Sequence, residues 1–240
     1  MALASNELKR ASLPARHELK YFINPTELEV LRKRLRAALP MDKHCVRGKP
    51  YIIRSLYFDT LDDSAFHDKQ NGVQDRDKYR IRVYRYSDKE IFLERKRKLG
   101  DLIQKSSTQI TRRLCDQIIA GDPKGLYRSQ NALLRDLYVQ MRTHILRPAV
   151  IVDYEREAYL HPAEDTRITF DLKLRTGLAS RDIFNPNLPT ICPHDHNWEI
   201  LEVKYNNYLP SYCMGLLAGI DVNCSAISKY ILCRRFEPLE

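Results

Sequence analysis

The chain has 240 residues, and 40 lysines and arginines against 31 aspartates and glutamates give it a formal net charge of +9. A hydrophobic fraction of 43% and a charged fraction of 30% exclude an intrinsically disordered chain. No run approaches the roughly 20 apolar residues that a membrane-spanning helix requires, and the polar N-terminus does not resemble a secretory signal. We therefore expect a cytoplasmic protein whose excess of positive charge attracts a polyanion.

The cysteines and the connecting segments bear on compartment and domain number. Six cysteines stand at positions 45, 115, 192, 213, 224 and 233, and no two form a Cys-x-x-Cys pair. Without an export signal, we expect free buried thiols rather than disulfides. No Ser/Gly-rich linker or internal repeat divides the chain. We expect a flexible tail over residues 1–14, followed by one domain over residues 15–240.

The first half alternates predicted strands and helices. A strand over 16–22 is followed by a helix, for which Asn24 is a suitable N-cap, Pro25 suits the first helical position and Glu27 completes a capping box. Strict alternation of polar and apolar residues marks the strand at 78–84. Further strands are predicted over 51–58, 90–97 and 102–107, and further helices over 61–70, 111–120 and 129–145.

The second half repeats the pattern. Strands are predicted over 150–159, 167–174 and 198–205, and helical stretches near 210–219 and 225–233. A polar, proline-rich loop spans 180–197. The count reaches about eight strands, mostly joined by hairpins, which favours an antiparallel sheet or barrel.

Charged residues recur on one face of these predicted strands. Residues i and i+2 of a strand share a face. A sheet with one solvated face explains a single strand of this kind, but six strands share the pattern. The faces collect Glu18 with Lys20, Lys78 with Arg80 and Arg82, Glu94 with Lys96 and Lys98, Tyr154 with Arg156, Arg167 with Thr169, Asp171 and Lys173, and Glu202 with Lys204.

If such a sheet closes, the charged faces converge on a lumen that accommodates side chains and one small ligand. A lumen lined with arginine and lysine is electrostatically unstable when empty, because like charges at that range repel. A phosphate chain supplies anions at regular spacing, and arginine binds phosphate oxygens with two parallel hydrogen bonds. Each glutamate either holds Mg²⁺ or Mn²⁺ together with phosphate oxygens, or pairs with a neighbouring arginine and fixes its position. The pattern leaves both explanations open.

Eight short motifs occur in a specific order over residues 16–230. They are RHELKY at 16–21, SLYFDT at 55–60, KYRIRVY at 78–84, FLERK at 92–96, YEREAY at 154–159, RITFD at 167–171, LEVKY at 201–205 and SKY at 228–230. In this order they resemble the VTC domain, the polyphosphate polymerase branch of the triphosphate tunnel metalloenzyme (CYTH-like) superfamily. The resemblance implies an α+β fold, an antiparallel eight-stranded β-barrel with flanking helices.

The resemblance also implies an activity and a set of site residues. The implied enzyme is an ATP-dependent polyphosphate polymerase, which transfers the terminal phosphate of ATP to a growing inorganic polyphosphate chain with the help of Mn²⁺ or Mg²⁺. The implied catalytic residues are Arg80, Arg82, Lys96, Arg156 and Lys229. The implied substrate-binding residues are Lys20, Lys69, Lys105, Tyr154, Arg167, Lys204 and Ser228. The implied metal ligands are Glu202, Glu94 and Glu18.

Alternatives stay open at this point. The same tunnel suits an inorganic or nucleoside triphosphatase, although Arg16 replaces the first of two glutamates that usually open the superfamily's first motif. A non-catalytic polyphosphate-binding module is a further alternative. We expect ATP and inorganic polyphosphate or triphosphate as partners, and no nucleic acid, because no helix-turn-helix, finger or RNA-binding signature is present. A separate membrane protein could recruit the domain. Trp198 shares a face with Glu202, and we expect it in the core or at the tunnel rim rather than as a base-stacking platform.

Overall fold

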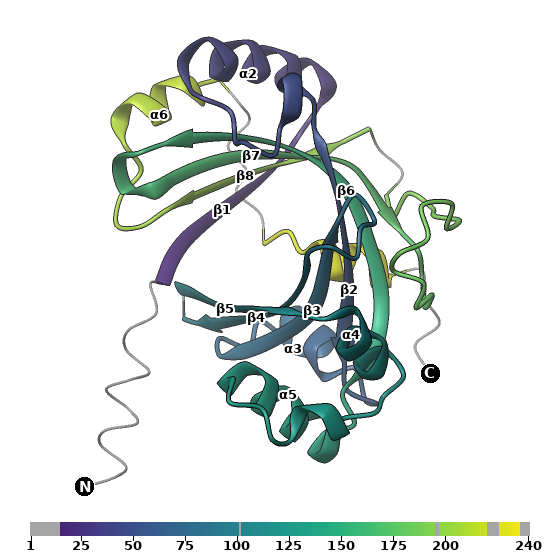
Figure 1. The fold of residues 1–240 in the computed structure, drawn as a ribbon. Coiled ribbons are helices and arrows are strands. Elements are labelled where there is room, and N and C mark those ends of the chain that lie inside the picture. The colour runs from purple at the N-terminus through teal and green to yellow at the C-terminus, as the bar shows by residue number, and fades with distance from the viewer. Residues whose placement is uncertain (1–14, 101, 195–196, 220–225, 236–240) are drawn as a thin grey trace, which may run out of the picture.

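The chain forms a closed barrel of antiparallel strands, which confirms the expected eight-stranded architecture within an α+β fold (Figure 1). The computed structural model describes residues 15–100, 102–194, 197–219 and 226–235, so the predicted tail over 1–14 lies outside the described residues. Around the barrel the strands follow the order β1-β5-β4-β3-β2-β6-β7-β8. Their bounds are β1 (Ala15–Ile23), β2 (Tyr51–Asp59), β3 (Arg76–Tyr84), β4 (Ile91–Leu99), β5 (Leu102–Ile110), β6 (Arg147–His161), β7 (Thr166–Thr176) and β8 (Glu199–Tyr205).

Helices flank the barrel where the sequence predicts them, with shorter bounds at several ends. None of the helices within the described ranges is long and apolar enough to span a membrane. The helices are α2 (Pro25–Ala38), α3 (Ser64–Gln70), α4 (Arg112–Ile119), α5 (Ala132–Thr143), α6 (Ser211–Leu216) and α7 (Lys229–Arg234), and short 3₁₀ turns cover Val46–Gly48, Lys124–Leu126 and Ala163–Asp165.

Local capping sets where the helices begin. The capping box predicted for α2 is present, because Asn24 Oδ1 accepts from the Glu27 amide at 2.9 Å and Glu27 Oε2 accepts from the Asn24 amide at 2.8 Å. Helix α5 begins later than predicted because Asn131 caps it, accepting from the amides of Leu133 and Leu134. An amide oxygen at this position satisfies donors that the first helical turn leaves unpaired.

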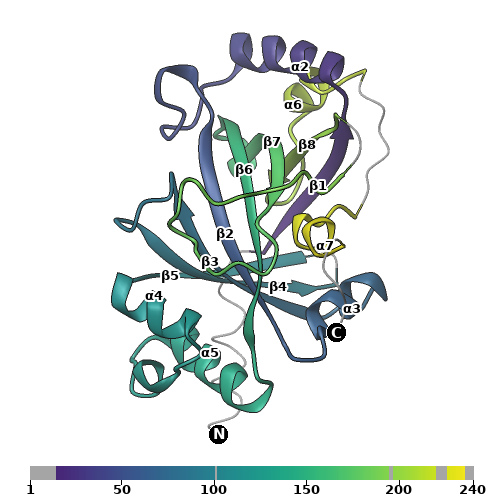
Figure 2. The same cartoon turned by 90° about the vertical axis from the view of Figure 1, so that its right-hand side faces the viewer.

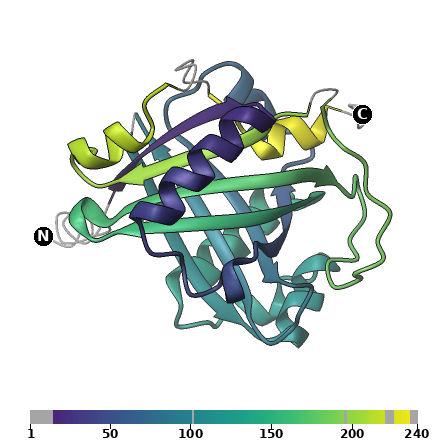
Figure 3. The same cartoon turned by 90° about the horizontal axis from the view of Figure 1, so that it is seen from above.

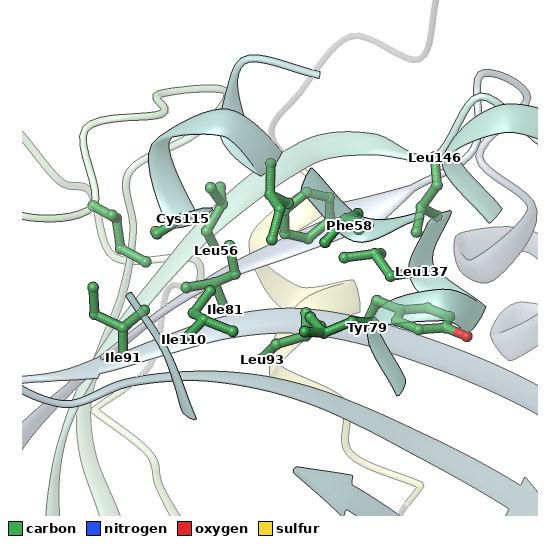
Figure 4. Packing of buried hydrophobic residues seen from close by; sticks show 14 of the residues in the cluster. Leu56, Phe58, Tyr79, Ile81, Ile91, Leu93, Ile110, Cys115, Leu137 and Leu146 are labelled. Atoms are coloured by element: carbon green, nitrogen blue, oxygen red, sulfur yellow. The ribbon is translucent and has the colours of Figure 1, made fainter. Parts of the chain in front are cut away.

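One hydrophobic cluster lies outside the barrel, between β2–β5 and the helices α4 and α5. Figure 4 shows Leu56, Ile81 and Leu93 of the strands meeting Cys115 of α4 and Leu137 of α5, and all five are fully buried. Figure 2 shows both helices on the same side of the barrel. Because alternate residues of a strand point to opposite faces, this packing directs their charged neighbours into the lumen.

A second cluster fixes the outside of β1, β7 and β8. Leu28, Leu31 and Leu35 of α2 are buried against apolar residues of these strands, including Tyr21 and Phe170. Figure 3 shows α2 crossing over this part of the barrel. The apolar residues at helical spacing therefore pack against the barrel, as their pattern predicts. The charged residues of the same strands again point into the lumen.

Helix α7 enters one end of the barrel and fills part of the lumen. Its Tyr230 and Ile231 belong to one buried cluster with Val150 and Val152 of β6. Val152 points to the inner face, because it lies directly opposite Ser55 of β2. Figure 2 shows this helix, coloured yellow, at one end of the barrel. The lumen is thus closed in part by apolar packing at the α7 end, while its remaining wall is charged.

The expectation that Lys173 shares the lumen face with Asp171 is wrong. The pairing of β6 with β7 shifts register between Asp153 and Glu155, and Lys173 itself has a positive φ of 51°. The bulge turns the Lys173 side chain outward, where its ammonium pairs with Glu155 at 2.9 Å. A single inserted residue reverses the parity of every residue beyond it, and strand periodicity alone does not reveal it.

The packing of α5 generates a stability prediction. Leu137→Ala should lower the free energy of unfolding by about 2–5 kcal/mol, because the fully buried side chain leaves a cavity between α5 and the barrel. Val139→Ala on the same helix is the matched control, since Val139 is 49% exposed and should change stability by less than about 0.5 kcal/mol. Urea denaturation followed by circular dichroism measures both, and equal effects would contradict the packing.

Candidate functional site

The strand register brings the predicted site residues together on the inner face of the barrel. Directly opposed residues of antiparallel strands share a face. Glu18 lies opposite Lys204 and Lys20 opposite Glu202. By the same rule Arg80 lies opposite Glu94, Arg82 opposite Ser55, Lys96 opposite Lys105, and Arg156 opposite Asp171. Helix α7 adds Lys229, and Ser228 is its N-cap.

Glu94 lies at the centre of a first group of cations. Its Oε2 accepts from Arg80 Nε at 2.7 Å, and its Oε1 lies 2.5 Å from Lys105 Nζ and 3.7 Å from Arg82 Nη1. Arg80 also donates to the Tyr57 hydroxyl at 2.7 Å. The carboxylate thus orders three cations at once, which corresponds to the second of the two explanations for lumen glutamates.

Asp171 is the centre of a second group, on β7. It accepts two hydrogen bonds from Arg156, at 2.6 and 2.8 Å, and it also pairs with Lys229 of α7. Arg156 donates further to Glu202 at 3.2 Å. The Tyr154 ring lies beneath both cations, 5.3 Å from the Arg156 guanidinium carbon and 5.1 Å from Lys229 Nζ. The result is a fixed guanidinium, held in a forked geometry.

Glu18 and Glu202 share a third group of cations. Lys96 donates to both oxygens of Glu18, at 2.8 and 2.9 Å. Lys204 lies 3.0 Å from Glu202 and 3.9 Å from Glu18, and Lys20 lies 3.6 Å from each. Two carboxylates on adjacent strands are therefore bridged by lysines rather than by direct contact.

The lumen carboxylates are ionised at neutral pH. Burial raises the pKa of Glu18, but the ammonium groups of Lys96, Lys204 and Lys20 outweigh it and lower the pKa to about 2. Burial likewise opposes ionisation of Asp171, while Arg156 and Lys229 lower its pKa to about 2. Glu94 and Glu202 also have pKa values well below the ordinary range, for the same reason.

On the inner face the lysines and arginines outnumber the carboxylates, so this negative charge does not fully compensate the positive charge. Burial lowers the pKa of Lys204 to about 7, even though Glu202 and Glu18 favour its charged form. Burial lowers the pKa of Lys105 to about 8, with Arg82 and Arg80 adding to the effect against Glu94. Burial is the largest cause of both shifts, so the lowered pKa values reflect mainly the desolvation of the two ammonium groups.

A further set of cations lies near α3 and the start of α7. Within the described part of the chain, no ion pair joins Lys69 or Lys78 to a carboxylate, and Lys78 Nζ instead lies 3.3 Å from Ser228 Oγ. The pKa of Lys78 is lowered to about 7, mainly by burial and then by the neighbouring cations Arg76, Lys20 and Lys69. The Asp59 carboxylate has the opposite, smaller effect. Anionic groups of a ligand would relieve this repulsion.

Arg82 has hydrogen-bonding capacity that the protein does not use. Its side chain is buried, and its Nε has no hydrogen-bond partner among the described residues. The facing Ser55 hydroxyl is also buried and lacks a partner there. A buried unpaired donor costs about 1–3 kcal/mol, so an anion that accepts from Arg82 would stabilise this part of the lumen.

Arg167 lies opposite Lys204 in the register of β7 and β8, toward the end of the barrel away from α7. It is paired with Asp42 at 2.8 Å and donates to the Tyr51 hydroxyl at 3.0 Å, and its side chain is 31% exposed. The structure thus places this predicted substrate-binding residue at the rim, while Lys69 lies on α3 at the other end.

The donor set fits a metal only in part. Among the residues that the structure describes, no group of three or more histidine, cysteine, aspartate or glutamate side chains could hold a metal ion. Mg²⁺ and related ions, however, commonly use one or two carboxylates and complete their coordination with phosphate oxygens and water. Glu18 and Glu202 could supply such a pair, because Lys20 and Lys204 contact both of them. Glu94 lies in a separate group, with Arg80, Arg82 and Lys105.

Some residues of the site were not assigned to it from the sequence. Asp171 and Lys78 were placed on the charged faces by parity, but their contacts with α7 depend on how the chain's end folds back. Tyr57 and Ser55 lie on the inner face of β2, where alternate apolar neighbours in SLYFDT mark the opposite face. Parity within that strand was the available signal for both.

The fold and the family are independently supported. The family model for the VTC domain matches residues 15–236. The Hippeastrum protein HpAC1, for which a dominant triphosphatase activity is described, superposes with a TM-score of 0.51 at 16% identity, covering 95% of this chain and 99% of that one. A Bacillus halodurans protein provisionally named an adenylate cyclase has a TM-score of 0.48 at 14% identity, covering 84% of this chain and 86% of that one. No curated protein matches the sequence.

The likeness to HpAC1 supports the tunnel fold alone, since the two sequences are only 16% identical. The family match covers nearly the whole described barrel, including every strand from β1 to β8 and helix α7. The resemblance that the eight motifs carry is thereby confirmed, and the chain belongs to the VTC domain family.

Proposed function

We propose that this protein is a metal-dependent polyphosphate polymerase, which transfers the terminal phosphoryl group of ATP to the end of an inorganic polyphosphate chain inside the barrel. The observation that carries the proposal is the excess of positive charge in the lumen, where Arg82 Nε is buried without a hydrogen-bond partner among the described residues. A linear polyanion complements such a lumen along its length, and membership of the VTC family agrees with that ligand.

The reaction would form one bond and break one. A terminal oxygen of the polyphosphate acceptor attacks the γ-phosphorus of ATP, the bond from that phosphorus to the β–γ bridging oxygen breaks, and ADP leaves. The acceptor phosphate is already ionised, so no strong general base is needed. Phosphoryl transfer asks the protein mainly for positioning and for stabilisation of charge on the transferred group.

Arg80, Arg82 and Arg156 are the residues best placed for that stabilisation. Glu94 and Tyr57 hold Arg80, and Asp171 holds Arg156 with two hydrogen bonds. Each guanidinium is thus ordered before substrate arrives, so little reorganisation is needed during the reaction. Lys96, Lys229 and Lys204 would add point charges along the phosphates, and Lys20 and Lys105 would extend the same path.

Glu202 and Glu18 would hold the divalent metal, Mn²⁺ or Mg²⁺. The bound metal would neutralise charge on the phosphate oxygens and help to align donor and acceptor. Lys20 and Lys204 already balance these two carboxylates, so phosphate oxygens that attract the lysines would free the glutamates for the metal. Glu94 fits this metal site less well, because it lies in a separate group with Arg80, Arg82 and Lys105.

A triphosphatase is the second candidate. Here water replaces the polyphosphate acceptor, and orthophosphate is released without polymer. The activity described for HpAC1 favours this candidate, because that protein has the same barrel fold. A third candidate, a non-catalytic polyphosphate-binding module, would use the same cations without turnover.

Gel-resolved products after incubation with ATP and Mn²⁺ test the proposal. We expect a polyphosphate ladder from the wild-type protein and a reduction of about 10²–10³-fold for Arg82→Ala, as expected for the loss of one charge-stabilising donor. Arg113→Ala is the matched control, because Arg113 is an exposed arginine on α4. Orthophosphate without a ladder would favour the triphosphatase, and binding without either product would favour the binding module.

Lys78 generates a prediction about protons. In the free protein its pKa is about 7, so at about pH 8 the side chain is mostly neutral, and a bound polyphosphate would raise the pKa and protonate it. Binding of inorganic triphosphate should therefore take up protons, measured by calorimetry in buffers with different ionisation enthalpies.

Lys78→Met should reduce that uptake without abolishing it, because Lys204 and Lys105 also have lowered pKa values, of about 7 and about 8. Lys124→Met, at an exposed position on a 3₁₀ turn, provides the control. An unchanged proton uptake in Lys78→Met would show that Lys78 does not face the bound phosphates.

A further inference from the structure

A cavity of about 710 Å³ opens beside the α7 end of the barrel. Aromatic and aliphatic side chains form much of its wall, together with polar and cationic ones. Its lining includes Phe22, Trp198, Ile227, Ser228, Ile231 and Lys69. The cavity therefore combines an apolar surface with cationic and hydroxyl groups, which neither the polyphosphate chain nor the metal would require.

The cavity adjoins the charged lumen at residues Ile227 and Ser228. The Ile227 carbonyl accepts from the lumen residue Lys20 at 3.4 Å, and Ser228 Oγ lies 3.3 Å from Lys78 Nζ. Both residues also line the cavity. A ligand could thus place phosphates against Lys20 and Lys78 while its other end lies in the cavity.

The wall of the cavity suits a flat aromatic group. Trp198 is 43% exposed, and its ring meets the Phe22 ring edge to face, with centroids 6.0 Å apart. Ile227 and Ile231 add aliphatic surface. Aromatic rings bind nucleobases of any sequence by stacking, because every base has a π-face. The sequence predicted Trp198 in the core or at the tunnel rim rather than as a base-stacking platform, and in the structure its ring borders this cavity.

The opposite end of the barrel offers less room for a base. There, the rings of Tyr51 and Tyr84 pack against His44, and the His44 and Tyr84 rings stack at 5.8 Å with an angle of 5°. Tyr51 is only 3% exposed. These rings pack against one another, whereas the Trp198 side chain borders the cavity and is 43% exposed.

We propose that the cavity beside Trp198 binds the nucleobase of a nucleoside triphosphate, with the triphosphate entering the lumen past Ser228, Lys78 and Lys69. The proposal rests on the proposed function and specifies its donor site. The nucleotide then occupies the α7 end, and the polyphosphate chain extends toward the end where Arg167 lies. An inorganic triphosphate would use the lumen cations alone.

Calorimetric titration with non-hydrolysable imido analogues of ATP and of inorganic triphosphate tests this site. Trp198→Ala should weaken binding of the ATP analogue by about tenfold, which corresponds to about 1.4 kcal/mol, and leave binding of the triphosphate analogue unchanged. Trp198→Phe should retain most of the affinity, since it keeps a stacking ring. Tyr208→Ala serves as control, because Tyr208 is an exposed aromatic residue outside the cavity.

The outcomes separate this inference from the proposed function. If the wild-type protein binds the triphosphate analogue and Trp198→Ala affects neither ligand, the base lies elsewhere and only the inference is overturned. An equal loss for both ligands also overturns it, because the effect would not be specific to the base. If the wild-type protein binds neither analogue, the proposed function fails together with the inference.

Discussion

Closing a sheet around basic side chains imposes the electrostatic constraint on which the rest of this structure depends. Charged groups are costly to bury unless they are paired, and the lumen resolves this with a few carboxylates that each contact several cations. Outside the barrel, the clusters under α2 and under α4 and α5 hold the strands in register. The apolar packing outside the barrel therefore stabilises the closed sheet against repulsion between the cations inside it.

The same carboxylates order the site chemically. Glu94 and Asp171 fix arginines that would meet phosphate oxygens, so the ion pairs of the free protein also preorganise the ligand site. Removing either acid would release a guanidinium as well as a countercharge. The lysines and arginines of the inner face outnumber these carboxylates, and a ligand could neutralise the remaining charge. Stability and proposed activity thus depend on one network.

Much of this arrangement could be predicted from the sequence, because it follows from local periodicity. Alternation along KYRIRVY and LEVKY predicted which side chains share the lumen, and the Asn24 capping box predicted the start of α2. Features that depend on distant segments could not be predicted. Lys229 reaches Asp171 only because α7 folds back into the barrel, the bulge at Lys173 reverses a parity, and the cavity beside Trp198 combines four segments.

Thermal unfolding with added phosphates tests the central claim, that the lumen stores positive charge for a linear polyanion. At equal ionic strength, we predict that inorganic triphosphate and longer polyphosphates raise the Tm with increasing concentration, and that orthophosphate raises it much less. A ligand at about 100 times its Kd should stabilise the fold by about 2.7 kcal/mol. A Tm that triphosphate leaves unchanged, or that orthophosphate raises equally, would contradict the account.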